Sequence, residues 1–253
     1  MPKTIFISGA TSGFGKAIAE RFAKDGENLI ITGRRKERLE AFAQELIKIF
    51  HVKVLTLNFD VRVEQEVNAA IKSIPKDFQT IDILVNNAGL ASGMSTIQDG
   101  KTEDWDVMID TNIKGLLYVT HAVLPLLYNS STPHIINIGS TAGKEVYLKG
   151  NVYCATKHAV DAISKALRID LLEKGVKVTQ IAPGAAETEF SIVRLHGDKD
   201  AAKKIYEGYQ PMTAQDIALV VHFAATLPKN LCINDMVLTS LAQANNLYFN
   251  RKI

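Results

Sequence analysis

The first 24 residues constrain the fold of this chain more than any other stretch. Lys3 to Ser8 is a short apolar segment of the kind that forms a buried strand. It leads into a glycine-rich turn, Gly9-Ala10-Thr11-Ser12-Gly13-Phe14-Gly15, and then into residues 16–24, whose apolar positions repeat with helical spacing. Glycines let the backbone approach a pyrophosphate, and the following helix N-terminus offers free N–H groups and a positive dipole end. Strand, glycine turn and helix in this order predict a nucleotide phosphate site.

Strand-like and helical segments alternate along the rest of the chain. The expected strands cover residues 3–8, 28–33, 52–59, 81–85, 134–139, 177–182 and 236–241, and the main helices residues 16–24, 37–50, 64–73, 104–128, 153–173 and 213–226. The pattern predicts an α/β protein, with residues 1–253 forming a single-domain Rossmann fold. Its doubly wound, mostly parallel seven-stranded sheet should carry helices on both faces. Residues 185–211, rich in small, polar and charged side chains, are expected to form a flexible substrate flap.

Arginines follow the second expected strand, where the chain reads Gly33-Arg34-Arg35. An NAD enzyme of this fold places a carboxylate there for the ribose 2′-hydroxyl. Two guanidiniums instead match a 2′-phosphate in charge and geometry, which predicts NADP(H) as the cofactor. Asp60 ends the third strand, where it could accept a hydrogen bond from the adenine amino group or cap the next helix.

A second group of residues indicates acid/base chemistry. Tyr153 and Lys157 are four apart and share one face of an expected helix. A neighbouring ammonium favours phenolate, so we expect Lys157 to lower the pKa of Tyr153 and make it a general acid/base. Ser140 ends the buried strand before this helix, where its hydroxyl could hold a substrate oxygen.

Composition argues against several other classes of protein. The net charge of +2 gives no reason to expect nucleic acid or an anionic membrane surface as a partner. The two cysteines have no metal or redox spacing, so we expect no metal site and a cytoplasmic location. We also expect no membrane-spanning segment, since no apolar run reaches 18 residues.

Taken together, the motifs resemble the short-chain dehydrogenase/reductase family over essentially the full length. The glycine turn matches the family's cofactor turn, and Asn86-Asn87-Ala88-Gly89 matches the motif after its fourth strand. The catalytic tetrad of the family falls on Asn112, Ser140, Tyr153 and Lys157. Pro183-Gly184 and Thr188 look like the segment beside the nicotinamide. The resemblance implies cofactor contacts from Gly9, Thr11, Ser12, Gly13, Phe14, Gly15, Arg34, Arg35, Asp60, Val61, Asn87, Ala88, Gly89, Tyr153, Lys157, Pro183, Gly184 and Thr188.

Several stretches are most similar to the NADP-dependent 3-hydroxy acid dehydrogenases, the group that includes serine and L-allo-threonine dehydrogenases. They cover residues 86–94, 103–120, 136–143 and 188–197. This implies an oxidoreductase for a small 3-hydroxy acid, with Tyr153 as general acid/base, Ser140 orienting the substrate oxygen and Asn112 holding a water that links Lys157 to solvent. The family also implies a homotetramer, packed through the helices near residues 104–128 and 153–173.

The substrate carboxylate needs a partner, for which Arg194 on the flap is the first candidate and Lys149 and Lys144 follow. Ala185-Ala186, Lys144 and Lys149 depart from the group's pattern, which leaves the exact substrate open. A broad carbonyl reductase, a 3-oxoacyl-carrier-protein reductase and, more remotely, a non-catalytic NADPH-binding sensor are the alternatives.

Overall fold

A computed structural model of the protein describes residues 2–251. Its centre is one sheet of seven parallel strands in the order β3-β2-β1-β4-β5-β6-β7. The strands are β1 (Thr4–Ile7), β2 (Asn28–Thr32), β3 (Val54–Leu57), β4 (Ile83–Asn86), β5 (His134–Ile138), β6 (Lys177–Pro183) and β7 (Asp235–Leu238). The predicted doubly wound Rossmann fold is confirmed.

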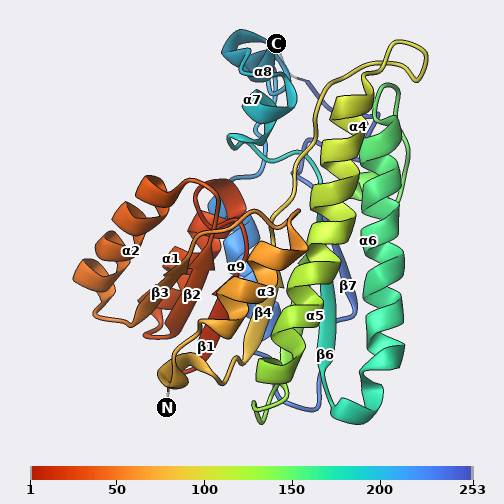
Figure 1. The fold of residues 1–253 in the computed structure, drawn as a ribbon. Coiled ribbons are helices and arrows are strands. Elements are labelled where there is room, and N and C mark those ends of the chain that lie inside the picture. Colours follow the sequence, from red (N-terminus) through yellow and green to blue (C-terminus); the bar gives the residue numbers. More distant parts are fainter. Residues whose placement is uncertain (1, 252–253) are drawn as a thin grey trace.

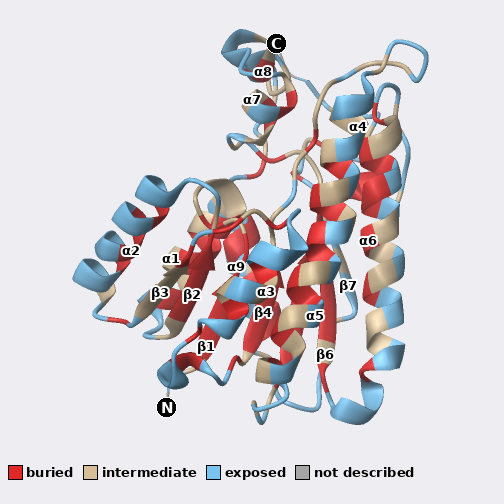
Figure 2. Ribbon diagram, in the orientation of Figure 1, coloured by how far each residue is buried: buried red, intermediate tan, exposed pale blue. Residues whose placement is uncertain are grey.

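Helices cover both faces of the sheet (Figure 1). One face carries α1 (Gly13–Lys24), α2 (Lys36–Phe50) and α9 (Ala214–Ala225). The other carries α3 (Glu64–Lys72), α5 (Leu116–Leu127) and α6 (Asn151–Asp170), with α4 (Thr102–Ile109) packed against α6. Figure 2 shows the resulting pattern, in which buried strands lie between helices whose outer faces are exposed.

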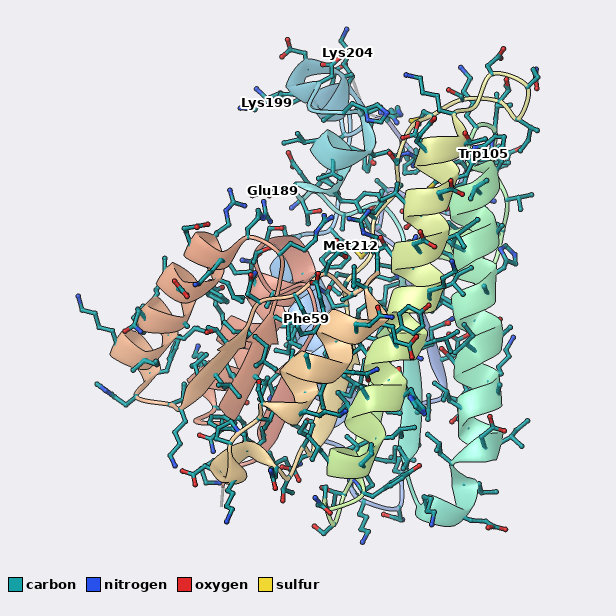
Figure 3. All side chains as sticks on the ribbon, in the orientation of Figure 1. Phe59, Trp105, Glu189, Lys199, Lys204 and Met212 are labelled. Carbon is teal, nitrogen blue, oxygen red and sulfur yellow. The ribbon has the colours of Figure 1, made fainter. Side chains whose placement is uncertain are left out.

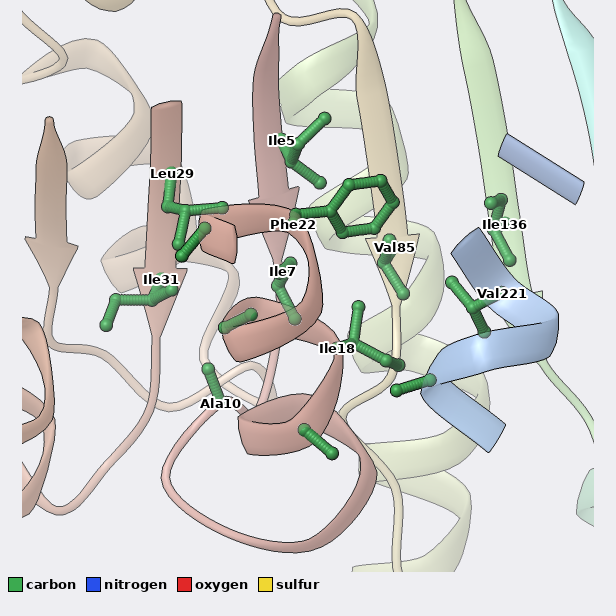
Figure 4. Packing of buried hydrophobic residues seen from close by; sticks show 14 of the residues in the cluster. Ile5, Ile7, Ala10, Ile18, Phe22, Leu29, Ile31, Val85, Ile136 and Val221 are labelled. Carbon is green, nitrogen blue, oxygen red and sulfur yellow. The ribbon is translucent and has the colours of Figure 1, made fainter. Parts of the chain in front are cut away.

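The central strand β1 explains why both layers are needed. Successive side chains of a strand point to opposite faces. Ile5 and Ile7 pack in the cluster that contains Phe22 of α1 and Val221 of α9, as Figure 4 shows. Phe6 packs in the second cluster, among residues of α3 and α5. Because β1 is apolar on both faces, it is stable only when both are covered.

The sheet order places a topological switch point between β1 and β4. The chain runs outward from β1 through β2 to β3 and then continues from β4 on the other side of β1. Connections that depart in opposite directions leave a crevice at the carboxyl ends of the strands, which is where ligands bind in this class of fold.

The expected long helix over residues 104–128 is interrupted. A π-helical segment, Asp110–Gly115, separates α4 from α5 and contains the buried Asn112. Such segments arise where one residue more than the α-helical spacing allows is accommodated, often at functional sites.

The flap and the C-terminal segment lie together beyond the carboxyl ends of the strands (Figure 1). The flap contains two short helices, α7 (Phe190–Arg194) and α8 (Lys199–Lys204), and its ends meet in a bridge between Ala186 and Met212. Strand β7 ends at Leu238, three residues before the end expected from the sequence, and residues 239–251 fold back toward the cavity: Gln243 accepts a hydrogen bond from the Ala185 amide, and Asn246 accepts one from Thr141. No helix within residues 2–251 is long and apolar enough to cross a membrane.

Candidate active site

A cavity of about 940 Å³ opens at the carboxyl edge of the sheet. Its walls bring together most of the residues predicted to bind cofactor or substrate, from segments far apart in the chain. These are Gly9, Thr11, Ser12, Gly13, Phe14, Arg34, Arg35, Asp60, Val61, Asn87, Ala88, Gly89, Ser140, Tyr153, Pro183, Gly184, Thr188 and Arg194. Five predicted residues do not line it: Gly15, Asn112, Lys144, Lys149 and Lys157.

The glycine turn is shaped so that only glycine fits at its closest approach. Gly9 has φ +70°, and a Cβ there would lie 2.9 Å from the Cα of Ala88. The Asn87 side chain ties β4 to the turn by donating hydrogen bonds to the carbonyls of Ser8 (2.8 Å) and Gly9 (3.0 Å). Helix α1 begins at Gly13, and the side chain of Ser12 leaves its first N–H groups uncapped. These residues therefore fit a dinucleotide, with the pyrophosphate at the start of α1.

Beside the turn, arginine side chains surround the expected position of the adenosine ribose. Arg35 donates hydrogen bonds to the hydroxyls of Thr11 and Ser12, both at 2.9 Å, through Nη2. Arg34 is more exposed and lies 3.7 Å from the Asp60 carboxylate. With no carboxylate directly after β2, this arrangement fits a 2′-phosphate better than a free 2′-hydroxyl.

Asp60 is bound by its neighbours and does not cap α3, whose N-cap residue is Val63. Its carboxylate accepts hydrogen bonds from the Arg62 amide (3.0 Å) and guanidinium. Burial tends to raise the pKa of Asp60, but the Arg62 hydrogen bonds and the charges of Arg62 and Arg34 lower it overall. The contact of Asp60 with adenine stays a prediction, whereas the capping of α3 by its side chain is not observed.

Tyr153 lies at the inner end of the cavity, between the flap and Ser140. Its ring is 9% exposed and packs against Phe190, with 5.6 Å between ring centroids. Ser140 donates a hydrogen bond to the Pro183 carbonyl (3.3 Å) and accepts one from the Ala142 amide (3.1 Å). The strand end thus holds the serine hydroxyl at the cavity wall, as the sequence predicted.

Lys157 does not lower the pKa of Tyr153 in the ligand-free chain, contrary to our expectation. Its ammonium donates a hydrogen bond to the Ile138 carbonyl (2.9 Å) and lies 6.0 Å from the centre of the Tyr153 ring. Burial raises the pKa of Tyr153 above its ordinary value, although the Ser140 hydroxyl and the Arg194 charge oppose this. Burial also lowers the pKa of Lys157, to about 8. Helix spacing places the two side chains on one face, but burial is the largest cause of both pKa shifts.

Asn112 does not line the cavity, but its side chain holds together two segments beside it. Its side chain exchanges hydrogen bonds with the backbone of Leu90, at 2.9 Å to the amide and 2.8 Å to the carbonyl, and donates one to Thr156 at 3.0 Å. The π-helical segment therefore fastens the loop after β4 to α6, next to Lys157. The role in holding a water stays a prediction.

The substrate end of the cavity contains an unusual arginine. Arg194 is 9% exposed, and its Nη1 donates a hydrogen bond to the Tyr147 hydroxyl (3.0 Å). Its Nη2 is buried and has no hydrogen-bond partner within residues 2–251. A buried guanidinium donor without a partner is costly, which indicates that a ligand atom belongs beside it.

Neither of the two lysine candidates lies at this end of the cavity. Lys144 forms ion pairs with Asp161 and Asp235, which hold it behind the site. Lys149 is exposed in a left-handed turn (φ 64°) and does not line the cavity, but it lines a small adjoining hollow that Tyr153 and Arg194 also border. Of the three candidates for the substrate carboxylate, Arg194 is the one that lines the cavity and lies over the Tyr153 ring.

Several lining residues escaped sequence reasoning. Tyr147 lies in an irregular segment before α6 and belongs to no motif, so only its hydrogen bond with Arg194 reveals it. Phe190 and Glu189 belong to the flap, and further lining residues come from the C-terminal segment, residues 239–251, which contains no motif. The missed lining residues include Tyr147, Glu189, Phe190, Tyr206, Tyr209, Gln243, Asn246, Phe249 and Arg251. Among residues 2–251 there is no cluster of three or more potential metal ligands.

The fold and the cavity together define a Rossmann-type, dinucleotide-binding oxidoreductase. The family model described as "short chain dehydrogenase" matches residues 3–197. The chain therefore belongs to the short-chain dehydrogenase family, and the resemblance seen in the sequence is confirmed.

Individual relatives show which members of the family the chain is similar to. A serine 3-dehydrogenase of Rhizobium radiobacter is 47% identical, over 96% of both chains. An NADP-dependent 3-hydroxy acid dehydrogenase of Salmonella typhi is 46% identical, over 95% of this chain and 96% of that one. A sulfoacetaldehyde reductase of Chromohalobacter salexigens is 46% identical, over 96% of both. Among solved structures, the closed form of a serine dehydrogenase complexed with NADP+ superposes with a TM-score of 0.91 at 43% identity, covering 98% of this chain and 100% of that one.

Proposed function

We propose that this protein is an NADP-dependent dehydrogenase that interconverts a small 3-hydroxy acid and the corresponding 3-oxo acid. The observation that carries this proposal is the buried, unpartnered Nη2 of Arg194 beside the Tyr153 ring. A substrate carboxylate there would satisfy the arginine, and its hydroxyl-bearing carbon could then reach the phenol. The relatives named for serine and for 3-hydroxy acids support this choice of substrate.

Tyr153 and Ser140 each have a task in the proposed reaction that their surroundings suit. Tyr153 accepts the substrate hydroxyl proton in oxidation and returns it in reduction. The raised pKa keeps the phenol protonated in the ligand-free chain, which is the state that reduction requires. Ser140, held by the Pro183 carbonyl, polarises and orients the substrate oxygen.

The cofactor residues divide the cavity into two ends. Arg34 and Arg35 hold the 2′-phosphate, the glycine turn receives the pyrophosphate, and Pro183 to Thr188 faces the nicotinamide. The Thr188 side chain adjoins the turn, since a Cβ on Gly13 would lie 3.5 Å from it. When bound there, the nicotinamide supplies the hydride acceptor or donor, whereas the protein supplies position and the proton.

The test is a substrate panel with initial rates at pH about 8 to 9. We expect NADP-dependent oxidation of L-serine, L-allo-threonine or 3-hydroxypropanoate, at least about 10³-fold slower in Tyr153→Phe, which removes the proton carrier. If the protein used only sulfoacetaldehyde, which it would reduce with NADPH, the anion site at Arg194 would stand, but the anionic group of the substrate would be a sulfonate and not a carboxylate. Turnover confined to uncharged ketones would contradict the proposal and leave a general carbonyl reductase.

We also propose a cytoplasmic homotetramer. Large apolar side chains are exposed on the helices expected to pack between subunits, including Leu117 on α5 and Ile169 on α6, which is 76% exposed. The free thiols of Cys154 and Cys232 fit a reducing compartment. Light scattering should give the mass of four 27.8 kDa chains, and Ile169→Lys should lower it. A 27.8 kDa particle in the unmodified protein would contradict this assembly.

A further inference from the structure

Glu189 connects the flap to the arginines of the cofactor site. Its carboxylate accepts hydrogen bonds from Arg35 Nη1 at 3.1 Å and from Arg38 Nη1 at 2.9 and 3.0 Å. Figure 3 shows Glu189 between α2 and the flap helices. Burial tends to raise the pKa of Glu189, but the hydrogen bond from Arg35 and the charges of Arg38 and Arg35 lower it overall, so the carboxylate is ionised at neutral pH.

These contacts use four of the five N–H donors of Arg35. Its Nε and Nη2 already donate to Thr11 and Ser12 on the glycine turn, and its Nη1 is used by Glu189. A 2′-phosphate placed beside this turn would bring two negative charges close to the Glu189 carboxylate and would draw on the same guanidinium.

The same flap segment continues into the active site. Glu189 directly precedes α7, whose first residue, Phe190, packs on Tyr153. The last residue of α7 is Arg194, which also lies over the Tyr153 ring. The five-residue helix α7 therefore connects Glu189 directly to Arg194, the proposed substrate anchor.

We propose that Glu189 occupies the arginine site in the cofactor-free protein and is displaced by the 2′-phosphate of NADP, which releases the start of the flap. This inference rests on the proposed NADP dependence. A cofactor with a free 2′-hydroxyl lacks the charge to displace the carboxylate, so NAD leaves the flap attached to the arginines. Glu189 then acts as a positioning residue that makes the flap respond to the 2′-phosphate, at the expense of some affinity for NADP.

The test compares 2′,5′-ADP with 5′-AMP, which differ only in the 2′-phosphate, by isothermal titration calorimetry. Glu189→Gln removes the competing charge, so 2′,5′-ADP should bind roughly three- to tenfold more tightly, whereas the affinity for 5′-AMP should stay within about twofold. The matched control is Glu187→Gln, an exposed flap residue two positions earlier that does not line the cavity. It should change neither affinity.

A second measurement follows the flap itself through tryptic cleavage at Lys199, Lys203 and Lys204 of α8. In the unmodified protein 2′,5′-ADP should accelerate cleavage there and 5′-AMP should not, and Glu189→Gln should be cleaved at the faster rate without ligand. Unchanged or weaker binding of 2′,5′-ADP by Glu189→Gln, or cleavage rates that are the same with 2′,5′-ADP and 5′-AMP, would overturn the inference. If the unmodified protein binds 5′-AMP as tightly as 2′,5′-ADP, the NADP proposal itself fails, which is a separate result.

Discussion

The guanidinium carbon of Arg194 lies 5.7 Å from the centre of the Tyr153 ring and 5.5 Å from that of Tyr147. A buried positive charge thus stands between two aromatic rings, one of which is the proposed acid/base. Favourable cation–π contacts hold the arginine in place, while its Nη2 stays free for a ligand. This relationship links the anionic end of a substrate to the site of proton transfer.

Removing the Tyr147 hydroxyl should weaken substrate binding without removing the chemistry. Tyr147→Phe leaves the ring under Arg194 but takes away the acceptor for its Nη1. We expect KM for the hydroxy acid to rise roughly three- to tenfold while kcat stays within about twofold, because the lost hydrogen bond orients Arg194 and does not carry the proton. Steady-state kinetics measure this, and a fall in kcat with unchanged KM would contradict it.

Arg34→Ala should weaken the use of NADP selectively. Arg34 lines the cavity and is free to bind a phosphate, apart from its loose contact with Asp60. We expect kcat/KM for NADP to fall roughly ten- to hundredfold, with the value for NAD almost unchanged. The control is Lys36→Ala, which removes a neighbouring exposed cation that does not line the cavity. Equal losses with both cofactors would show that Arg34 does not contact the 2′-phosphate.

The stability of the protein should fall in mild acid because of His134. Its side chain is fully buried in β5, and burial, aided by the charges of Lys177 and Lys3, lowers its pKa from 6.5 to about 3. Protonation therefore favours the unfolded chain, so this contribution to stability is intact above pH 6.5 and is lost as pH falls from there toward 3. The loss should approach about 1.4 kcal/mol per pH unit.

His134→Leu isolates this effect. The free energy of unfolding of the unmodified protein relative to His134→Leu should decline between pH 6.5 and 4, as denaturant titrations can measure. The same comparison with His121→Leu, whose side chain is exposed, should show no such decline. A constant difference for His134 would mean that the buried imidazole titrates normally.

The fold was predictable because its signals are local and repeat. Inner strands such as β1 are apolar on both faces, and most of the turns that end the strands contain glycine, proline or amides. The interruption by the π-helical segment at Asn112 was not predictable, because its side chain is bound by Leu90, a residue 22 positions earlier. Only the folded chain brings these two together.

The cofactor end of the cavity was predicted better than the substrate end. The glycine turn and Arg34 belong to one compact βαβ unit, where sequence spacing determines spatial proximity. The substrate end is assembled from a flap, an irregular segment at Tyr147 and a tail folded back through Gln243, which are joined by tertiary contacts alone. For the same reason Lys144, close to Ser140 in sequence, proved to be bound by Asp161 and Asp235 instead.

The expected effect of Lys157 on the pKa of Tyr153 shows a further limit of prediction from sequence spacing. Helical spacing predicts that two side chains share a face, but it gives neither their burial nor the carbonyl of Ile138 that takes the ammonium. The direction of the pKa shift depended on desolvation, which is a property of the whole fold.

The most direct test of the account is the discrimination between 3-hydroxypropanoate and its uncharged methyl ester, measured as a ratio of kcat/KM with NADP. Arg194→Met keeps an apolar body between the tyrosines but removes the anion partner. The unmodified protein should prefer the acid, and Arg194→Met should lose roughly ten- to hundredfold of kcat/KM for the acid with little change for the ester. If both substrates lose activity equally, or neither does, Arg194 does not hold the substrate carboxylate and the hydroxy acid assignment fails.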